Sequence, residues 1–286
     1  PQAAIGKVRL HDGFNWGYDP LHYGVPEGSY STNPEGITRI REFREMVQTL
    51  EKMNLGVVMD VVYNHTHAAG EDPQSILDKI VPGYYYRLDT EGKVQHTSCC
   101  PDTASEHAMM EHLMIQTLVR WAKAYHVRGF RFDLMGHHTR ENLLQIRQAL
   151  DQLTLAKDGI NGRSIYLYGE GWKFGSLDAV SSASAMHQVN AAGTGIGTFN
   201  DRMRDSLRGG NFDHNTRSDQ GFINGLFLNP NHSPWNTDTP KSAEAQAEQL
   251  LNYTQLIRLS MAGNLANFNL SGVKGKSLSY RGQPPA

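Results

Sequence analysis

The sequence predicts an α/β fold with a parallel β-sheet. Segments with apolar residues every three or four positions, as on one face of a helix, alternate with short apolar runs that are typical of strands. Helices that alternate with strands in this way imply right-handed crossovers and parallel strand pairing. The length of 286 residues fits about two domains of roughly 150 residues or one α/β barrel of about 250 residues.

The first helix and strand are expected within residues 35–62. Apolar residues from Ile37 to Met53 recur at helical spacing and predict a helix over residues 35–54, which Gly56 ends. The run at residues 57–62 is rich in valine and lacks a clean apolar–polar alternation. This pattern predicts a strand that is buried on both faces.

The same unit recurs further along the chain. Helical stripes at residues 110–121 and 143–150 precede expected strands at residues 129–133 and 164–168. Further elements are expected at residues 195–199 (a strand), 201–207 (a helix) and 242–264 (a helix). Residues 209–239 have loop composition, which fits an ordered insert over a site as well as a solvated linker.

The charge balance and the apolar runs limit the partners of the chain. There are 27 Lys and Arg residues against 29 Asp and Glu residues, for a net charge of −2. This balance predicts no nucleic-acid partner and no attraction to an anionic membrane. The longest apolar stretch, residues 55–63, contains Asp60 and is much shorter than the roughly 20 residues of a membrane span, so a soluble chain is expected.

The only two cysteines, Cys99 and Cys100, are adjacent and cannot join distant segments. Partly buried thiols and a vicinal disulfide are both open, and neither assigns a compartment. The chain begins at Pro1 without a leader and ends at Ala286 in an apparent loop. We therefore expect a segment of a longer protein, in which a secretion signal would precede Pro1.

Ionisable residues stand at the ends of three expected strands. Asp60 lies on the first, Arg131 and Asp133 on the second, and Glu170 follows the third. Because the carboxyl ends of parallel strands converge on one face, a single site can hold all four. Arg131 and Asp133 are two positions apart and point the same way, which fits a structural ion pair as well as catalysis.

Two carboxyl groups at one cleft suit glycoside hydrolysis. The acid beside Arg131, Asp133, would stay ionised as the nucleophile, and Glu170, between Tyr168 and Trp172, would stay protonated as the general acid. A retaining mechanism needs the two carboxyl groups about 5 Å apart. The sequence thus offers candidates for both roles.

Several strings carry a family resemblance. Residues 60–65, 129–135 and 168–172 resemble the first three of the four conserved segments of the α-amylase superfamily of glycoside hydrolases, in the correct order. Residues 14–20, Phe-Asn-Trp-Gly-Tyr-Asp-Pro, and residues 195–202, Gly-Ile-Gly-Thr-Phe-Asn-Asp-Arg, resemble type I pullulanases, the debranching members of that superfamily. The resemblance runs across nearly the whole chain.

The resemblance implies roles for the matching residues. Asp133 matches the nucleophile, Glu170 the general acid and later base, and Arg131 the arginine that keeps the nucleophile ionised. The residues implied to support the site or bind the sugar are His65, Asp60, Tyr18, Trp172 and Asn15. The implied activity is hydrolysis of α-1,6-glucosidic bonds in pullulan, amylopectin or glycogen-derived dextrins by a retaining double displacement.

The resemblance also implies an incomplete (β/α)8 barrel. Residues 1–286 would form part of one catalytic domain, approximately strands 2 to 6 with their helices, truncated at both ends. The family's fourth segment, His-Asp-Asn with the third catalytic carboxylate, does not occur in the sequence and is expected beyond Ala286. We therefore expect the 286-residue chain alone not to hydrolyse pullulan.

The implied partner is an α-glucan polysaccharide or oligosaccharide, with no metal or other cofactor needed for the chemistry. A structural calcium ion is compatible with the resemblance, and an extracellular or cell-surface location is expected. The oligomeric state is open.

Three alternatives remain at this stage. An isoamylase-like debranching enzyme shares the three catalytic segments. A metal-dependent hydrolase could use His65 and His67, with Asp133, Glu170, His137 and His138 expected nearby. A non-catalytic glucan-binding remnant could keep the aromatic residues Tyr18, Trp16 and Trp172.

Overall fold

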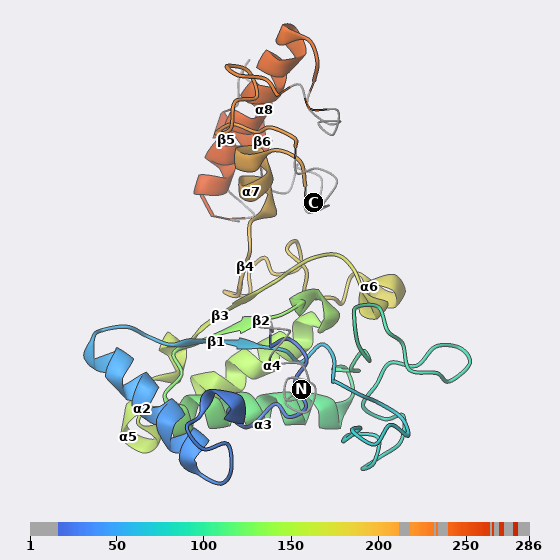
Figure 1. The fold of residues 1–286 in the computed structure, drawn as a ribbon, viewed down its shortest axis with the longest axis vertical. Coiled ribbons are helices and arrows are strands. Elements are labelled where there is room, and N and C mark those ends of the chain that lie inside the picture. The colour runs from blue at the N-terminus through green and yellow to red at the C-terminus, as the bar shows by residue number, and fades with distance from the viewer. Residues whose placement is uncertain are drawn as a thin grey trace. The chain divides into compact units, whose positions relative to one another are not determined.

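A computed structural model describes residues 17–211, 218–231, 233, 240–263, 265, 269–271 and 277–279. The chain divides into two compact units, Pro1–Gly197 and Thr198–Ala286. The order of the elements along the chain can be followed by colour in Figure 1.

A parallel sheet forms the first unit, as the sequence predicts. Its strands are β1 (Val58–Val61), β2 (Gly129–Phe132), β3 (Tyr166–Gly169) and β4 (Gly197–Thr198), in the spatial order β1-β2-β3-β4. The boundary between the two units falls within β4, after Gly197. The pairs β1–β2 and β2–β3 are both parallel. β3 begins two residues later than expected because Gly162–Ser164 forms a 3-10 turn, η3.

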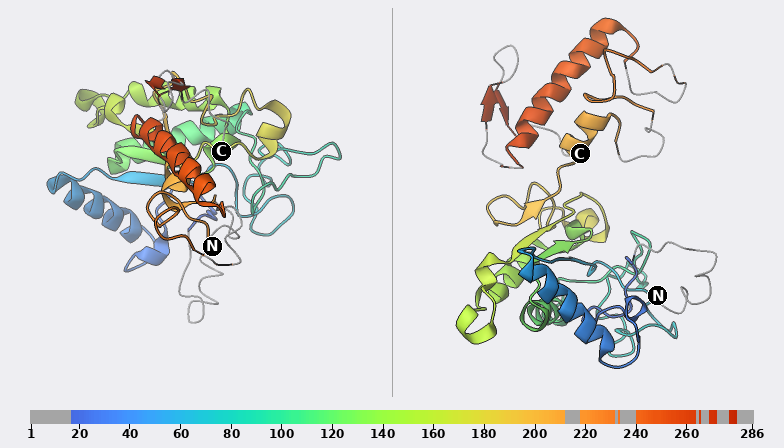
Figure 2. Two further views of the ribbon diagram at one scale, coloured as in Figure 1. Left: turned by 90° about the horizontal axis from the view of Figure 1, so that it is seen from above. Right: turned by 60° about the vertical axis from the view of Figure 1, so that its left-hand side comes forward.

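Three helices lie along one face of this sheet (Figures 1 and 2). They are α2 (Thr38–Lys52), α3 (Ala108–Tyr125) and α4 (Arg140–Asp151). Each boundary lies within four residues of the predicted helix or apolar stripe. The shorter elements of this unit are η1 (Gly28–Tyr30), η2 (Met135–His137), α5 (Leu155–Asp158) and α6 (Ser176–Ser181).

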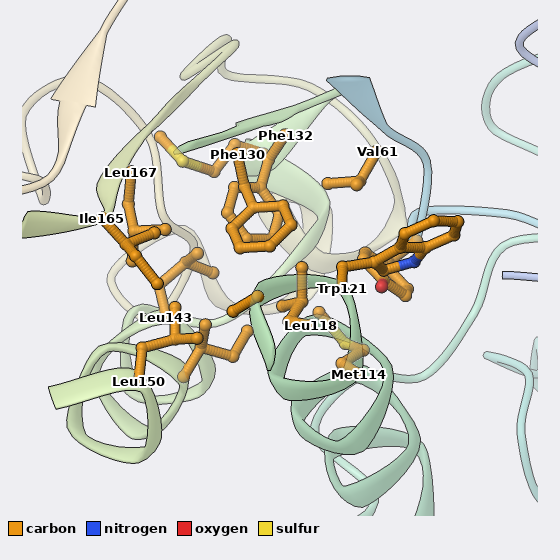
Figure 3. Packing of buried hydrophobic residues seen from close by; sticks show 14 of the residues in the cluster. Val61, Met114, Leu118, Trp121, Phe130, Phe132, Leu143, Leu150, Ile165 and Leu167 are labelled. Atoms are coloured by element: carbon orange, nitrogen blue, oxygen red, sulfur yellow. The ribbon is translucent and has the colours of Figure 1, made fainter. Parts of the chain in front are cut away.

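The hydrophobic core fills the space between the sheet and α3 and α4. Phe130 and Phe132 on β2 are both 0% exposed. Figure 3 shows their rings facing Leu118 of α3 and Leu143 of α4. Burial of such side chains stabilises the fold by about 1.5–3 kcal/mol each, so the core fixes the sheet that positions the strand ends.

The expectation that residues 57–62 are buried on both faces is wrong. Val58 is 44% exposed, and Tyr166, which lies on the same face through the register of Gly129, is 55% exposed. Within the described residues β1 is an edge strand, and the helices α2, α3 and α4 of the first unit lie along one face of the sheet (Figure 1). A run of apolar residues predicts burial, but it does not tell which neighbouring segments supply it.

The second unit contains α7 (Asp201–Arg208), α8 (Ala243–Met261) and an antiparallel pair, β5 (Asn269–Ser271) with β6 (Ser277–Ser279). Both helices were expected. Asn200 caps α7 by accepting from the backbone N–H of Met203, and Ser242 caps α8 by accepting from that of Ala245. Among the helices of the described residues, none has both the length and the apolar character to cross a membrane.

Candidate active site

Four ionisable side chains meet at the carboxyl ends of β1, β2 and β3. Arg131 Nη1 donates to Asp60 Oδ1 at 2.7 Å and to Asp133 Oδ1 at 3.0 Å. Its Nη2 forms an ion pair with Glu170 Oε1 at 2.7 Å. The residues that the sequence assigns to three strand ends therefore form one cluster around a single guanidinium.

The register of the sheet explains this convergence. Asp60 on β1 lies beside Arg131 on β2, which lies beside Tyr168 on β3. Asp133 and Glu170 follow two positions further along and therefore point to the same face. The ladder continues to them, since Asp133 N donates to the carbonyl of Val61 at 2.9 Å and Glu170 N to that of Phe132 at 3.0 Å.

The arginine contacts more groups than the sequence analysis assumed. The sequence predicts a pair of Arg131 with Asp133 alone and aromatic neighbours for Glu170, whereas Arg131 bonds to both acids and to Asp60. The planar guanidinium carries five N–H donors in a fork, so it can span three adjacent strands.

Burial and charge act in opposite directions within the cluster. Burial raises the pKa of Glu170, and the negative charges of Asp133 and Asp60 raise it further, although the Leu134 amide and Arg131 pull it down. For Arg131, burial lowers the pKa, but the hydrogen bond to Asp60 and the charge of Glu170 outweigh burial, so its pKa is raised. Glu170 therefore holds a proton to higher pH than an ordinary glutamate, as a general acid must.

Leu134 contacts the cluster through its backbone, which the sequence did not reveal. Its backbone N–H donates to Glu170 Oε2 at 3.1 Å. Its φ is +39° and its ψ is 51°, a left-handed conformation that is uncommon for a residue other than glycine. Such strain is typical of functional sites, and a leucine gives no sequence signal for it.

Tyr18 lies against the cluster. Its hydroxyl donates to Asp60 Oδ2 at 2.5 Å, and the Arg131 guanidinium lies 5.5 Å from the centre of its ring. Burial and the bond to Asp60 raise the pKa of Tyr18 to about 12. Tyr18, the predicted aromatic residue of the sugar site, therefore lies beside Asp60 and Arg131.

His65 is connected to Asp133 through Asn64. The buried Asn64 Nδ2 lies 3.0 Å from His65 Nδ1 and donates to Asp133 Oδ2 at 3.2 Å. His65 Nε2 in turn donates to the carbonyl of Tyr18 at 2.6 Å. The sequence placed Asn64 at a strand end but gave it no role, because an amide that links two other side chains shows no pattern of its own.

The structure brings one predicted site residue, Trp172, into no bond with this cluster among the described residues, and it does not describe another, Asn15. Trp172 is partly buried, two positions after Glu170, and no bond from its indole to the Arg131 cluster is seen in the described part of the chain. Asn15 lies outside the described residues, as does Trp16. Their predicted contacts with substrate stay predictions.

The described residues do not assemble the histidine–carboxylate metal site of the alternative hypothesis. His67 bonds to Asp19 at 2.7 Å and to Gln74 at 2.8 Å, away from the partners of His65. His137 and His138 are buried, and burial lowers the pKa of both, that of His137 to about 4.

Cys99 and Cys100 form a disulfide, the second of the two states that the sequence left open. Within the described residues, the group of His, Cys, Asp and Glu side chains with metal-like spacing consists of this pair and His65.

Comparison with known proteins identifies relatives of this chain. The chain is 45% identical over 280 residues to the chloroplastic pullulanase 1 of Arabidopsis thaliana, covering 97% of this chain and 28% of that protein. It is also 45% identical over 294 residues to a pullulanase of Klebsiella pneumoniae, covering 99% of this chain and 25% of that protein. The chain is homologous to the pullulanases.

A solved structure agrees with this relationship. The crystal structure of the Klebsiella pneumoniae pullulanase complexed with maltotriose matches with a TM-score of 0.79 and 43% identity, covering 97% of this chain and 25% of that chain. The parallel sheet with its helices is accordingly part of an α/β barrel, as predicted. The chain spans about a quarter of the length of the pullulanases it matches. No protein-family model matches it.

Proposed function

We propose that this chain forms the central part of the catalytic barrel of a debranching enzyme that hydrolyses α-1,6-glucosidic bonds with retention. The observation that carries the proposal is the Arg131 guanidinium bonded to both Asp133 and Glu170 at the strand ends. The similarity to pullulanases supports the choice of substrate.

In the first step Asp133 attacks the anomeric carbon and Glu170 protonates the departing glycosidic oxygen. The bond from sugar to leaving group breaks as the glycosyl–Asp133 ester forms. In the second step Glu170, now a carboxylate, takes a proton from water, and the water oxygen displaces Asp133. Arg131 stabilises the carboxylate of Asp133 between turnovers.

Glu170 suits the role of proton donor on two grounds. Its carboxyl group is raised in pKa by burial, and its two oxygens are held in place by Arg131 and the Leu134 amide. A fixed orientation and a raised pKa are the two requirements of a general acid that works near neutral pH.

The proposal extends to the sugar-binding residues. Tyr18 would stack under the glucose unit at the cleaved bond, His65 would bond to one of its hydroxyl groups, and Trp172 and Asn15 would contact further sugar units. A related pullulanase was solved in complex with maltotriose, which supports an α-glucan ligand. The third catalytic carboxylate, a structural calcium ion and an extracellular location also belong to this proposal.

The experiment measures release of reducing ends from pullulan by the protein that carries this chain. Asp133→Asn and Glu170→Gln should each lower kcat by about 10²–10⁴-fold or more. An aryl glucoside with a good leaving group separates the two roles, because its first step needs no proton donor. Glu170→Gln should keep most of the glycosylation rate on that substrate, and Asp133→Asn should lose it.

The exposed Asp72, away from the cluster, supplies a matched control, and Asp72→Asn should leave kcat unchanged. Wild-type hydrolysis of pullulan by Asp133→Asn would disprove the assignment of the nucleophile. The 286-residue chain assayed alone should release no reducing ends.

A further inference from the structure

We propose that reduction of the Cys99–Cys100 disulfide creates a binding site for a thiophilic divalent cation of the Zn²⁺ class. Its ligands are the two thiolates and Nε2 of His65. The proposal concerns cation binding and stands independently of the proposed hydrolase activity.

The three ligand atoms are already close together. Cys99 Sγ lies 3.9 Å from His65 Nε2, and the two sulfur atoms and this nitrogen all lie within 4.8 Å of one another. In a tetrahedral zinc site, with bonds of about 2.0–2.3 Å, ligand atoms are roughly 3.4–3.8 Å apart. Once the S–S bond is broken, small side-chain rotations bring the three atoms to these distances.

The backbone holds the cysteine pair beside His65 without help from the disulfide. Thr66 N donates to the carbonyl of Pro101 at 3.3 Å, directly after the pair. Before the pair, Thr97 N donates to the carboxylate of the buried Asp102 at 3.2 Å, and Thr97 Oγ1 donates to it at 2.5 Å. A bond between adjacent residues closes no long loop, so its reduction leaves these anchors in place.

Reduction is chemically accessible. Cys99 is exposed and Cys100 is half-buried. A phosphine gives two electrons to the disulfide and becomes its oxide by taking the oxygen atom of one water molecule, whose two protons complete the two thiols. Binding of the cation then releases both thiol protons and forms two metal–sulfur bonds and one metal–nitrogen bond.

Binding of a cation to His65 changes which ring nitrogen carries the proton, and Asn64 lies beside the nitrogen that gains it. A cation at Nε2 replaces the bond from this nitrogen to Tyr18 and moves the ring proton to Nδ1. Asn64 Oδ1 is buried and accepts no hydrogen bond from the described residues, while Asn64 Nδ2 faces Nδ1. Rotation of the amide by half a turn presents Oδ1 to the new N–H, as an outer partner does at histidine ligands of metals, and gives up the hydrogen bond from Nδ2 to Asp133 Oδ2.

The test titrates Zn²⁺ into the chain in competition with a chromophoric chelator, before and after treatment with a phosphine. The reduced chain should bind one Zn²⁺ at least about 100-fold more tightly than the disulfide form. His65→Gln should weaken binding by at least about 10-fold. His67→Gln is the matched control and should leave the affinity unchanged, because its imidazole bonds to Asp19 and Gln74.

A second measurement uses the reduced chain without substitutions. Zn²⁺ should slow alkylation of both cysteines by iodoacetamide, followed by mass spectrometry of the peptide that contains them. Equal alkylation rates with and without Zn²⁺, or equal affinities of the oxidised and reduced forms, would overturn the proposal. An affinity of His65→Gln equal to that of the unaltered chain would overturn the assignment of His65 as a ligand.

Discussion

Arg131 is surrounded by more negative charge than it can neutralise. Asp60, Asp133 and Glu170 all contact its guanidinium, so three carboxyl groups share one positive charge. The imbalance, together with burial, favours a proton on one of the three. Glu170 is the group whose pKa is raised, which ties the acid–base property of the site to the register of the sheet.

The raised pKa predicts how stability depends on pH. The ordinary pKa of a glutamate, 4.5, applies to the unfolded chain, and the folded chain binds the Glu170 proton more tightly. The stabilising contribution of the protonated Glu170 to the free energy of unfolding is therefore fully present below about pH 4. It is lost as the pH rises through the higher pKa of the folded chain. Glu170→Gln lacks this loss, so its stability relative to the unaltered chain should increase between about pH 4 and pH 7.

The measurement is urea unfolding at several pH values, followed by tryptophan fluorescence. Glu35→Gln, at an exposed position, is the control. The difference between its free energy of unfolding and that of the unaltered chain should depend much less on pH. A stability difference for Glu170→Gln that falls as the pH rises would contradict the sign.

At the residue scale the sequence predicted the charged cluster but not its finer contacts. Asp60, Arg131 and Glu170 could be found because an ionisable residue at the end of an apolar strand is conspicuous. The left-handed backbone of Leu134 and the linking amide of Asn64 could not, since they depend on how two strand ends approach each other in space.

Strand β3 depends on a residue without a side chain. A Cβ at Gly169 would lie 2.5 Å from the carbonyl oxygen of Phe132 and 2.9 Å from its Cβ. Gly169→Ala should therefore cost about 1–3 kcal/mol in the free energy of unfolding, because β2 and β3 must separate. The shift moves Glu170, so hydrolysis by the protein that carries this chain should fall as well.

Urea unfolding measures the loss of stability, and release of reducing ends measures the loss of activity. Tyr166→Phe, on the same strand with an exposed ring, is the control and should change stability by less than about 0.5 kcal/mol. Unchanged stability of Gly169→Ala would show that β2 and β3 can separate at little cost.

Helix α4 is fixed at its start by a capping box. Thr139 accepts from the backbone N–H of Asn142 at 3.0 Å, and the Asn142 side chain accepts from that of Thr139 at 3.1 Å. Thr139→Ala removes one of these bonds and should cost about 1 kcal/mol. Thr139→Ser keeps the hydroxyl and should retain most of the stability, which thermal unfolding of both variants can check.

At the element scale the helices were predicted better than the strands. The apolar stripe of α3 runs from Met110 to Trp121, about three helical turns, and both ends of the stripe are fully buried. A strand of four residues such as β1 carries too few positions for its pattern to reveal which face is covered. The pair β5 and β6 was not predicted, because each strand has only three residues and one apolar position.

At the scale of the whole chain, the hydrophobic core lies within the first unit. All the buried residues of the main cluster, from Val61 to Ile196, belong to Pro1–Gly197. The resemblance predicts one partial barrel over residues 1–286, and this stays a prediction; the contacts within the chain form two compact units that divide at Gly197. Sequence motifs report membership of a domain, but cooperativity depends on which residues share a core.

The division predicts separate unfolding of the two units. Phe130 is fully buried in the core of the first unit, and Phe130→Ala should destabilise that unit by about 3–5 kcal/mol. Because α8 belongs to the second unit and contributes no residue to the main cluster, its stability should not change. Hydrogen exchange followed by mass spectrometry should show faster exchange in β1, β2, α3 and α4 and unaltered exchange in α8. Faster exchange in α8 to the same degree would instead show that the two units fold as one cooperative structure.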